Sequence, residues 1–170
     1  MDAYSKMINE SGNSLFIREI RPEEEEIARD VFYAALDAVD IKLKEKHRRP
    51  DGDLMDIRKW YTDAPGNIFL VGLVGDKIVA TGALTRIDDH RVKLRRMSVA
   101  PAYQGFGYGI QMLHELEFIA QRLAYREIIL DTASILVSAI GMYTRAGYVE
   151  TQREDVGGGI QLVYFSKKLR

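Results

Sequence analysis

Hydrophobic and polar positions along the chain follow two periods, which together predict a mixed α/β fold. Short runs rich in β-branched and aromatic residues predict strands, whereas apolar residues spaced by three and four predict helices. The expected strands, about seven in number, lie at residues 16–20, 68–74, 77–87, 91–99, 126–131, 148–153 and 160–169. The expected helices, about four in number, lie at residues 22–38, 54–61, 107–123 and 136–146. The long helix 107–123 connects two strands, so this β-α-β unit makes them parallel within one mixed sheet.

The fourth expected strand, residues 91–99, contains a break in its alternation. Val92 and Leu94 are separated by one residue, but two residues separate Leu94 from the next apolar residue, Met97. With a strict period of two, Met97 would face the opposite side of the sheet from Leu94. One extra residue near Arg95-Arg96 keeps these apolar side chains on one face, so we predict a β-bulge there.

A glycine-rich turn directly follows this strand and opens the long helix. Glycine occupies every second position at Gly105, Gly107 and Gly109, and apolar residues at helical spacing begin at Ile110. The first N–H groups of a helix have no partner within it, and the helix dipole adds partial positive charge there. Glycines let such a backbone approach a phosphate group closely. The turn therefore predicts a phosphate site, although its spacing is neither that of dinucleotide-binding turns nor that of nucleoside-triphosphate loops.

A second pattern lies further along the chain. After the strand around residues 128–132, a short helix reads Ala139-x-x-Met142-Tyr143-x-x-Ala146 and is closed by Gly147-Tyr148. Together with Gln104-x-x-Gly107-x-Gly109, and in this order, the pattern resembles the two signatures of the GCN5-related N-acetyltransferase (GNAT) superfamily. The resemblance extends over most of the chain. One position departs from it, because Leu136 stands where family members often carry an asparagine.

The resemblance implies a GNAT-type fold that binds acetyl-CoA as its co-substrate. The expected cofactor-binding residues are Met97, Ser98, Val99, Gln104, Gly105, Phe106, Gly107, Tyr108, Gly109 and Arg145. By the resemblance, the backbone N–H of Met97 or Val99, on the bulged strand, is expected to stabilise the oxyanion of the reaction, and Met97 is the residue assigned. Tyr143 is expected to act as a general acid toward the departing thiolate. A phenol of pKa ~10 can protonate a thiolate of pKa ~8.5 at a small uphill cost.

The general base is not specified by the sequence. Family members often place a glutamate on or near the bulged strand, but residues 91–99 contain no carboxylate. The remaining candidates are Asp88, Asp89, His90, Asp131 and Glu150. Deprotonation of the amine through a chain of water molecules is an equal alternative.

Composition narrows the remaining function classes. The 170 residues suit one N-acetyltransferase domain at residues 15–170 behind a polar leader at residues 1–14. A net charge of −1 gives no argument for nucleic acid or an anionic membrane as a partner. The absence of cysteine excludes disulfides and thiolate metal sites, and no histidine or acidic pattern indicates a metal. Without a signal peptide or a membrane-length apolar run, we expect a cytoplasmic protein.

The expected activity is transfer of an acetyl group from acetyl-CoA to a primary amine of a small molecule, such as a polyamine or an amino acid. The amine attacks directly within a ternary complex. The basic run at residues 42–49 is a candidate for attracting an acidic acceptor. Two alternatives stay open, namely acetylation of a protein lysine or N-terminus, and a non-catalytic acyl-CoA-binding module. The sequence also leaves open whether the protein is a monomer or a homodimer.

Overall fold

A computed structural model of the chain describes residues 7–8, 14–39 and 52–170. Its strands are β1 (Met7–Ile8), β2 (Ser14–Glu19), β3 (Ile68–Val74), β4 (Lys77–Arg86), β5 (Arg91–Val99), β6 (Glu127–Ala133), β7 (Val149–Asp155) and β8 (Gln161–Lys168). Its α-helices are α1 (Glu25–Asp37), α3 (Gly52–Met55), α4 (Tyr108–Arg122) and α5 (Val137–Arg145). Short 3₁₀ turns, η1 (Pro22–Glu24) and η3 (Pro101–Tyr103), precede α1 and α4, and a π-helical turn, η2 (Arg58–Thr62), follows α3.

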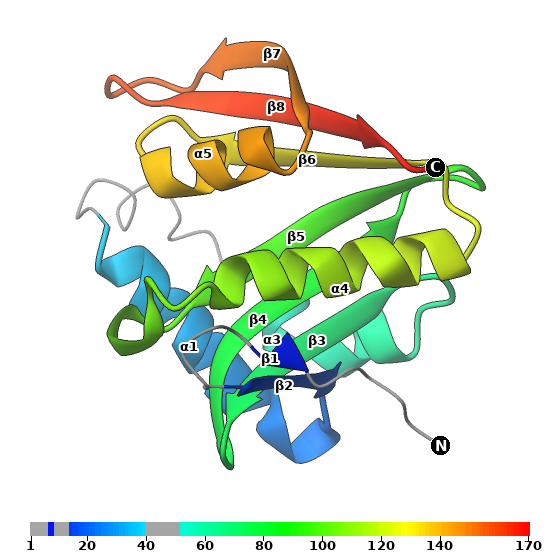
Figure 1. The fold of residues 1–170 in the computed structure, drawn as a ribbon, viewed down its shortest axis with the longest axis vertical. Helices are drawn as coiled ribbons and strands as arrows, with labels where there is room; N and C mark the ends of the chain where they lie inside the picture. The colour runs from blue at the N-terminus through cyan, green and yellow to red at the C-terminus, as the bar shows by residue number, and fades with distance from the viewer. Residues whose placement is uncertain (1–6, 9–13, 40–51) are drawn as a thin grey trace.

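The strands form one mixed sheet in the order β1-β2-β3-β4-β5-β6-β8-β7 (Figure 1). Strands β5 and β6 are parallel, and each of the other neighbouring pairs is antiparallel. Helix α4 connects the parallel pair, as a β-α-β crossover requires. The predicted α/β class and the mixed sheet are therefore confirmed.

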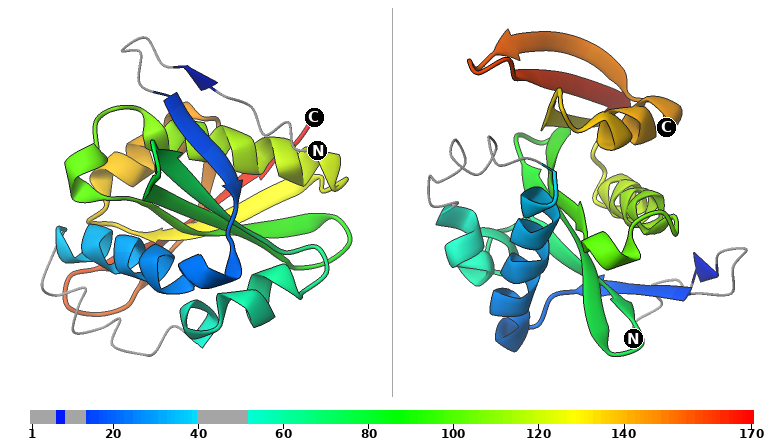
Figure 2. Two further views of the ribbon diagram at one scale, coloured as in Figure 1. Left: turned by 90° about the horizontal axis from the view of Figure 1, so that it is seen from below. Right: turned by 90° about the vertical axis from the view of Figure 1, so that its left-hand side faces the viewer.

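Helices cover both faces of the sheet and bury two separate hydrophobic cores (Figure 2). On one face, α4 packs Met112, Leu113 and Leu116 onto the sheet, and all three side chains are fully buried. On the other face, α1 and the segment from α3 to η2 pack around Phe32 and Tyr61. Both faces of the central strands are therefore apolar, which explains the near-continuous burial along β3 and β4.

The predicted bulge is present in β5, which is the fourth strand of the sequence-based assignment. Ala83 of β4 pairs with Arg95, whereas Thr81 pairs with Ser98, so β5 advances by one residue more than β4. Arg96 takes up the extra residue with a positive φ of 56°. As the alternation required, Leu94 and Met97 both pack into the core beneath α4.

One prediction about the N-terminal third needs correction, and one segment gains detail. Within the expected polar leader at residues 1–14, Met7–Ile8 form β1, which pairs with β2, and Ser14 belongs to β2. A free edge of β2 offers unpaired backbone groups, which a short extra strand can satisfy. The expected helix 54–61 is instead divided into α3 and η2. The basic run at residues 42–49 lies outside the described residues.

No helix in the described parts of the chain combines the length and the apolar composition needed to span a membrane. The longest described helix, α4, is amphipathic, with one buried face and exposed residues such as His114 and Phe118 on the other.

Gly82 provides a test of how the bulge is packed. A methyl group at this position would lie 2.7 Å from Leu116 Cδ1, 2.8 Å from Met112 Cγ and 3.0 Å from Met97 Sδ. We expect Gly82→Ala to lower the free energy of unfolding by about 1–3 kcal/mol in urea denaturation, because the core cannot accept the added volume. The control is Gly52→Ala, where an added methyl group meets no atom within 4 Å. Equal stability of the two variants would contradict this packing.

Candidate active site

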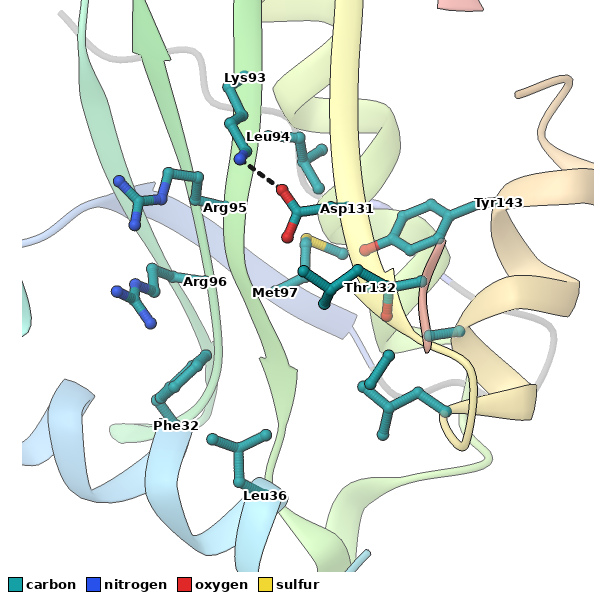
Figure 3. Close-up of a pocket in the computed structure, with 14 residues that line it drawn as sticks. Phe32, Leu36, Lys93, Leu94, Arg95, Arg96, Met97, Asp131, Thr132 and Tyr143 are labelled. Carbon is teal, nitrogen blue, oxygen red and sulfur yellow. Dashed lines mark ion pairs between the residues drawn. The ribbon is translucent and has the colours of Figure 1, made fainter. Parts of the chain in front are cut away.

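The parallel strands β5 and β6 stay together over only part of their length. Their pairing runs from Arg91 with Glu127 to Lys93 with Ile129 and then ends. Beyond that point lies a cavity of about 300 Å³ (Figure 3). Its lining comes from α1, β5, β6, α5 and β8: Phe32, Leu36, Lys93, Leu94, Arg95, Arg96, Met97, Asp131, Thr132, Ala133, Leu136, Ala139, Tyr143 and Leu162.

Tyr143 lines this cavity from α5 and is only 4% exposed. Its ring packs against Tyr148 and Phe165, with ring centroids 5.6 Å and 6.2 Å away. Burial, together with the negative charge of Asp131, raises the pKa of the Tyr143 hydroxyl well above its ordinary value. The phenol is therefore protonated at neutral pH, as a proton donor must be.

Met97 lies in the same cavity, so the structure brings the two predicted catalytic residues together. In the pairing of β5 with β4, Arg95 lies opposite Ala83 and Ser98 lies opposite Thr81. Arg96 and Met97 therefore share the single β4 position between them, Gly82. A bulge of this kind takes backbone groups out of the regular ladder. Thr81 Oγ1 holds the displaced strand by donating to the carbonyl of Arg96 at 2.7 Å.

The glycine turn lies at the exposed N-terminal end of α4. Gly105 and Gly107 have φ values of 84° and 80°, and a side chain built at either would meet no atom within 4 Å. Gln104 Nε2 donates to the carbonyl of Val99 at 3.0 Å and ties the turn to the end of β5. The N–H of Gln111 bonds to the Gly107 carbonyl at 3.2 Å, so the earlier amides of the helix point out of its end. This open, amide-lined turn fits a phosphate group.

The remaining predicted cofactor residues surround this turn. The rings of Phe106 and Tyr108 stack with their centroids 5.9 Å apart. Gly109 approaches α5 closely, since a methyl group there would lie 3.3 Å from Met142 Sδ. Arg145 is exposed at the end of α5 and folds back along its own helix toward Gly141. The turn and the helix that carries Tyr143 are therefore neighbours, although the turn itself does not line the cavity.

Only one of the five base candidates lines the cavity, and that residue is Asp131. It forms an ion pair with Lys93 of β5 (Figure 3). Asp88 instead caps the exposed turn before β5, where it accepts hydrogen bonds from the His90 and Arg91 amides. The other three candidates lie on the surface and outside the cavity lining: Asp89, His90 and Glu150.

A buried acidic residue that the sequence did not single out supports the bulge. Asp53, only 7% exposed, accepts bonds from Arg96 Nε at 2.9 Å and Arg96 Nη2 at 2.5 Å. It also accepts a short hydrogen bond from the Tyr61 hydroxyl. The Arg96 guanidinium in turn lies 5.2 Å from the centre of the Phe32 ring. These contacts hold the side chain of the one bulge residue that has a positive φ.

The charge state of Asp53 follows from the same contacts. Burial alone would raise the pKa of Asp53, but the bonds from Arg96 and Tyr61 and the charge of Arg95 oppose it, and the pKa is lowered overall. Because the carboxylate is the form that binds Arg96, the ionised pair is the stable state at neutral pH.

Asp53→Asn is expected to reduce the free energy of unfolding at pH 7 by about 3 kcal/mol, because the largely buried charge of Arg96 loses the carboxylate that is bonded to it. A pKa lowered by folding contributes its full stability above the unfolded-state value and loses it as the pH falls through the folded-state value. The difference from the wild type, measured by urea unfolding, should thus be constant between about pH 7 and 5 and shrink below about pH 4.

The control for this pair is Asp76→Asn in the exposed hairpin turn between β3 and β4, which should change stability little at any pH. A pH-independent difference for Asp53→Asn would contradict the assigned ion pair.

Comparison with known proteins places this chain in a family. Residues 25–148 match the sequence profile described as "Acetyltransferase (GNAT) family". The chain is 31% identical to human N-acetyltransferase 8B over 118 residues, which cover 66% of this chain and 49% of that protein. It is also 31% identical to N-acetylaspartate synthetase of Xenopus tropicalis over 97 residues, or 56% of this chain and 36% of that protein. The chain thus spans half or less of the length of these curated relatives.

Solved structures share the fold at lower identity. An acetyltransferase of the GNAT family from Staphylococcus aureus Mu50 has a TM-score of 0.75 at 21% identity, covering 92% of this chain and 99% of that chain. A Salmonella typhimurium protein solved with its cofactor acetyl-CoA has a TM-score of 0.68 at 18% identity, covering 92% and 94%. The matched profile extends from α1 to Tyr148 and includes the bulged strand, the glycine turn and α5. The chain therefore belongs to the acetyltransferase (GNAT) family, as the two sequence signatures predicted.

Proposed function

We propose that this protein is an acetyl-CoA-dependent N-acetyltransferase that acts on the primary amine of a small molecule. The observation that carries the proposal is the cavity between the separated ends of β5 and β6, which Met97 and Tyr143 both line. Its volume of about 300 Å³ is at the lower end of small-molecule sites. The N-acetylaspartate synthetases among the relatives, by their names, act on a small amino acid.

Acetyl-CoA would be held by the main chain on both sides of the β5–α4 connection. Residues 104–109 and the first amides of α4 would bind its diphosphate, and the backbone of Met97, Ser98 and Val99 would hold its thioester arm. Arg145, exposed on the neighbouring helix, would meet a phosphate group. When bound, acetyl-CoA supplies the activated acetyl group for transfer.

The residues of the chain then have three tasks. The N–H of Met97 donates to the oxygen on which negative charge develops, and it does so from a strand that Thr81 and Asp53 hold in place. Tyr143 supplies a proton to the leaving sulfur. Burial raises the pKa of the Tyr143 hydroxyl, which by itself makes the proton transfer less favourable. Poor solvation raises the pKa of the leaving thiol as well, so the difference between the two pKa values changes less than either value. Asp131 is the carboxylate in the described lining of the cavity, and we assign it as the acceptor of the amine proton, directly or through water.

Binding of acetyl-CoA is tested by thermal unfolding. A ligand that binds only the folded state at a hundredfold excess over its Kd stabilises it by about 2.7 kcal/mol, so we expect Tm to rise by about 5–10 °C. No shift at millimolar acetyl-CoA would argue against the proposal.

A matched pair of variants tests the place of binding. Gly105→Asn and Gly105→Asp have nearly the same shape, and both side chains tolerate the left-handed backbone required there. The added negative charge of Gly105→Asp should reduce the Tm rise from acetyl-CoA well below that of Gly105→Asn, because it faces the diphosphate. Equal responses would place the diphosphate elsewhere.

The role of Tyr143 is tested by Tyr143→Phe. Because the variant loses only the proton donor, we expect kcat for acetyl transfer, measured as thiol release, to fall about 100-fold while the Tm rise from acetyl-CoA persists. The control is Tyr148→Phe, which removes the hydroxyl of a neighbouring, similarly buried tyrosine that does not line the cavity. An equal loss of kcat in both variants would show that Tyr143 acts only through packing.

A further inference from the structure

The bulge gives two consecutive arginines the same orientation. In a regular strand Arg95 and Arg96 would point to opposite faces of the sheet, because neighbouring side chains alternate. Here both line the cavity and both approach Asp53, with Nη2 to Oδ1 distances of 3.9 Å for Arg95 and 2.5 Å for Arg96. Figure 3 shows both side chains extending to the same side of β5, away from Tyr143.

Asp53 forms hydrogen bonds with only one of these two arginines, Arg96. One of its oxygens accepts from Arg96 Nε and from the Tyr61 hydroxyl, and the other accepts from Arg96 Nη2. The 3.9 Å from Arg95 exceeds hydrogen-bond distance. Among residues 14–39 and 52–170, Arg95 forms no ion pair with any other carboxylate. The side chain of Arg95 is also 35% exposed, against 11% for Arg96, so it remains accessible from the cavity.

The other charges of the lining balance each other. Lys93 forms an ion pair with Asp131, and Arg96 forms one with Asp53. Arg95 has only the longer contact with the same Asp53, so around the described cavity lining three cations (Lys93, Arg95 and Arg96) face two carboxylates (Asp131 and Asp53), and one positive charge is in excess. A positive charge in a partly enclosed site attracts an anionic group and repels a cationic one.

We propose that Arg95 binds a carboxylate of the acceptor, so that the substrate is an amino acid or a similar amine that carries a carboxylate close to its amino group. This inference rests on the proposed function and narrows its substrate class. A planar guanidinium binds a carboxylate through two parallel hydrogen bonds, which fixes the orientation of the substrate as well as its affinity. Polyamines, which carry several positive charges and no carboxylate, would be poor acceptors.

Matched acceptors test the inference directly. Each amino acid of a panel is compared with its α-amide and with the amine that lacks the carboxylate, alongside the polyamines, by thiol release from acetyl-CoA. The best set is the group of amino acid, α-amide and amine that contains the fastest acceptor. Within it we expect kcat/KM to be about 10- to 100-fold higher for the amino acid, because the α-amide and the amine cannot form the charged hydrogen-bonded pair with Arg95. Equal kcat/KM across the best set, or a preference for polyamines, would overturn the inference and leave the acetyltransferase function standing.

Variants of Arg95 test whether this residue causes the preference for carboxylate-bearing acceptors. Arg95→Gln should raise KM for the carboxylate-bearing acceptor and reduce its advantage over the amide to less than about threefold, whereas Arg95→Lys should keep part of it. Arg126→Gln removes the same charge from an exposed position outside the cavity and should leave the preference unchanged. A preference that persists in Arg95→Gln would overturn the assignment. The Tm rise from acetyl-CoA, which should persist in every variant, shows that each one is folded.

A binding measurement separates this inference from the proposed function. Succinate has carboxylates but no amine, and succinamide is its uncharged counterpart. In the presence of CoA, millimolar succinate should raise the Tm of the wild type more than succinamide does, and this difference should disappear in Arg95→Gln. If no acceptor is acetylated and acetyl-CoA gives no Tm shift, the proposed function fails. The carboxylate site is overturned separately if succinate and succinamide act alike.

Discussion

The β-bulge in β5 is the constraint on which the site depends. It gives Arg96 a positive φ, which costs an ordinary residue about 1–2 kcal/mol, so other contacts must stabilise it. Thr81 binds the displaced carbonyl and Asp53 binds the guanidinium, while Gly82 leaves room for the Met97 side chain beneath the strand. Interactions from β4 and α3 thus hold the backbone that carries the proposed oxyanion donor.

The sheet supplies a cavity because its parallel pair separates. Strands β5 and β6 pair over three residues each, and the cavity begins where the pairing ends, at Lys93 and Asp131. Ligand sites of open α/β sheets lie beyond the carboxyl ends of the strands, since the helix N-termini also meet there. Here α4 begins at that end, and its Gly109 packs against Met142 of α5, next to Tyr143. One junction therefore joins the turn that we propose to bind the diphosphate to the proposed catalytic residues.

Charge has two separate roles around the cavity. The Asp53–Arg96 pair is largely buried, and its contacts with Tyr61 and Phe32 connect β5 to the helices of one face. A pair of this kind favours one geometry more than it adds stability, because desolvation offsets much of the attraction. Arg95, directly before it in the chain, is more exposed and remains available to a ligand. The bulge creates this division of roles by turning both side chains to one face.

The sequence by itself determined seven of the eight described strands, the crossover helix, the bulge near Arg95, the glycine turn and the resemblance to the family. Each of these features depends on residues close together in the chain, through a hydrophobic period, a break in that period or a spacing of glycines. Such local patterns do not predict which distant segments will contact one another. Asp53 lies 43 residues before Arg96 and follows a turn-like stretch, so nothing in its neighbourhood marks it as the partner of Arg96. Only the tertiary structure decided that pairing, and likewise that Asp131, alone among the five base candidates, faces the cavity.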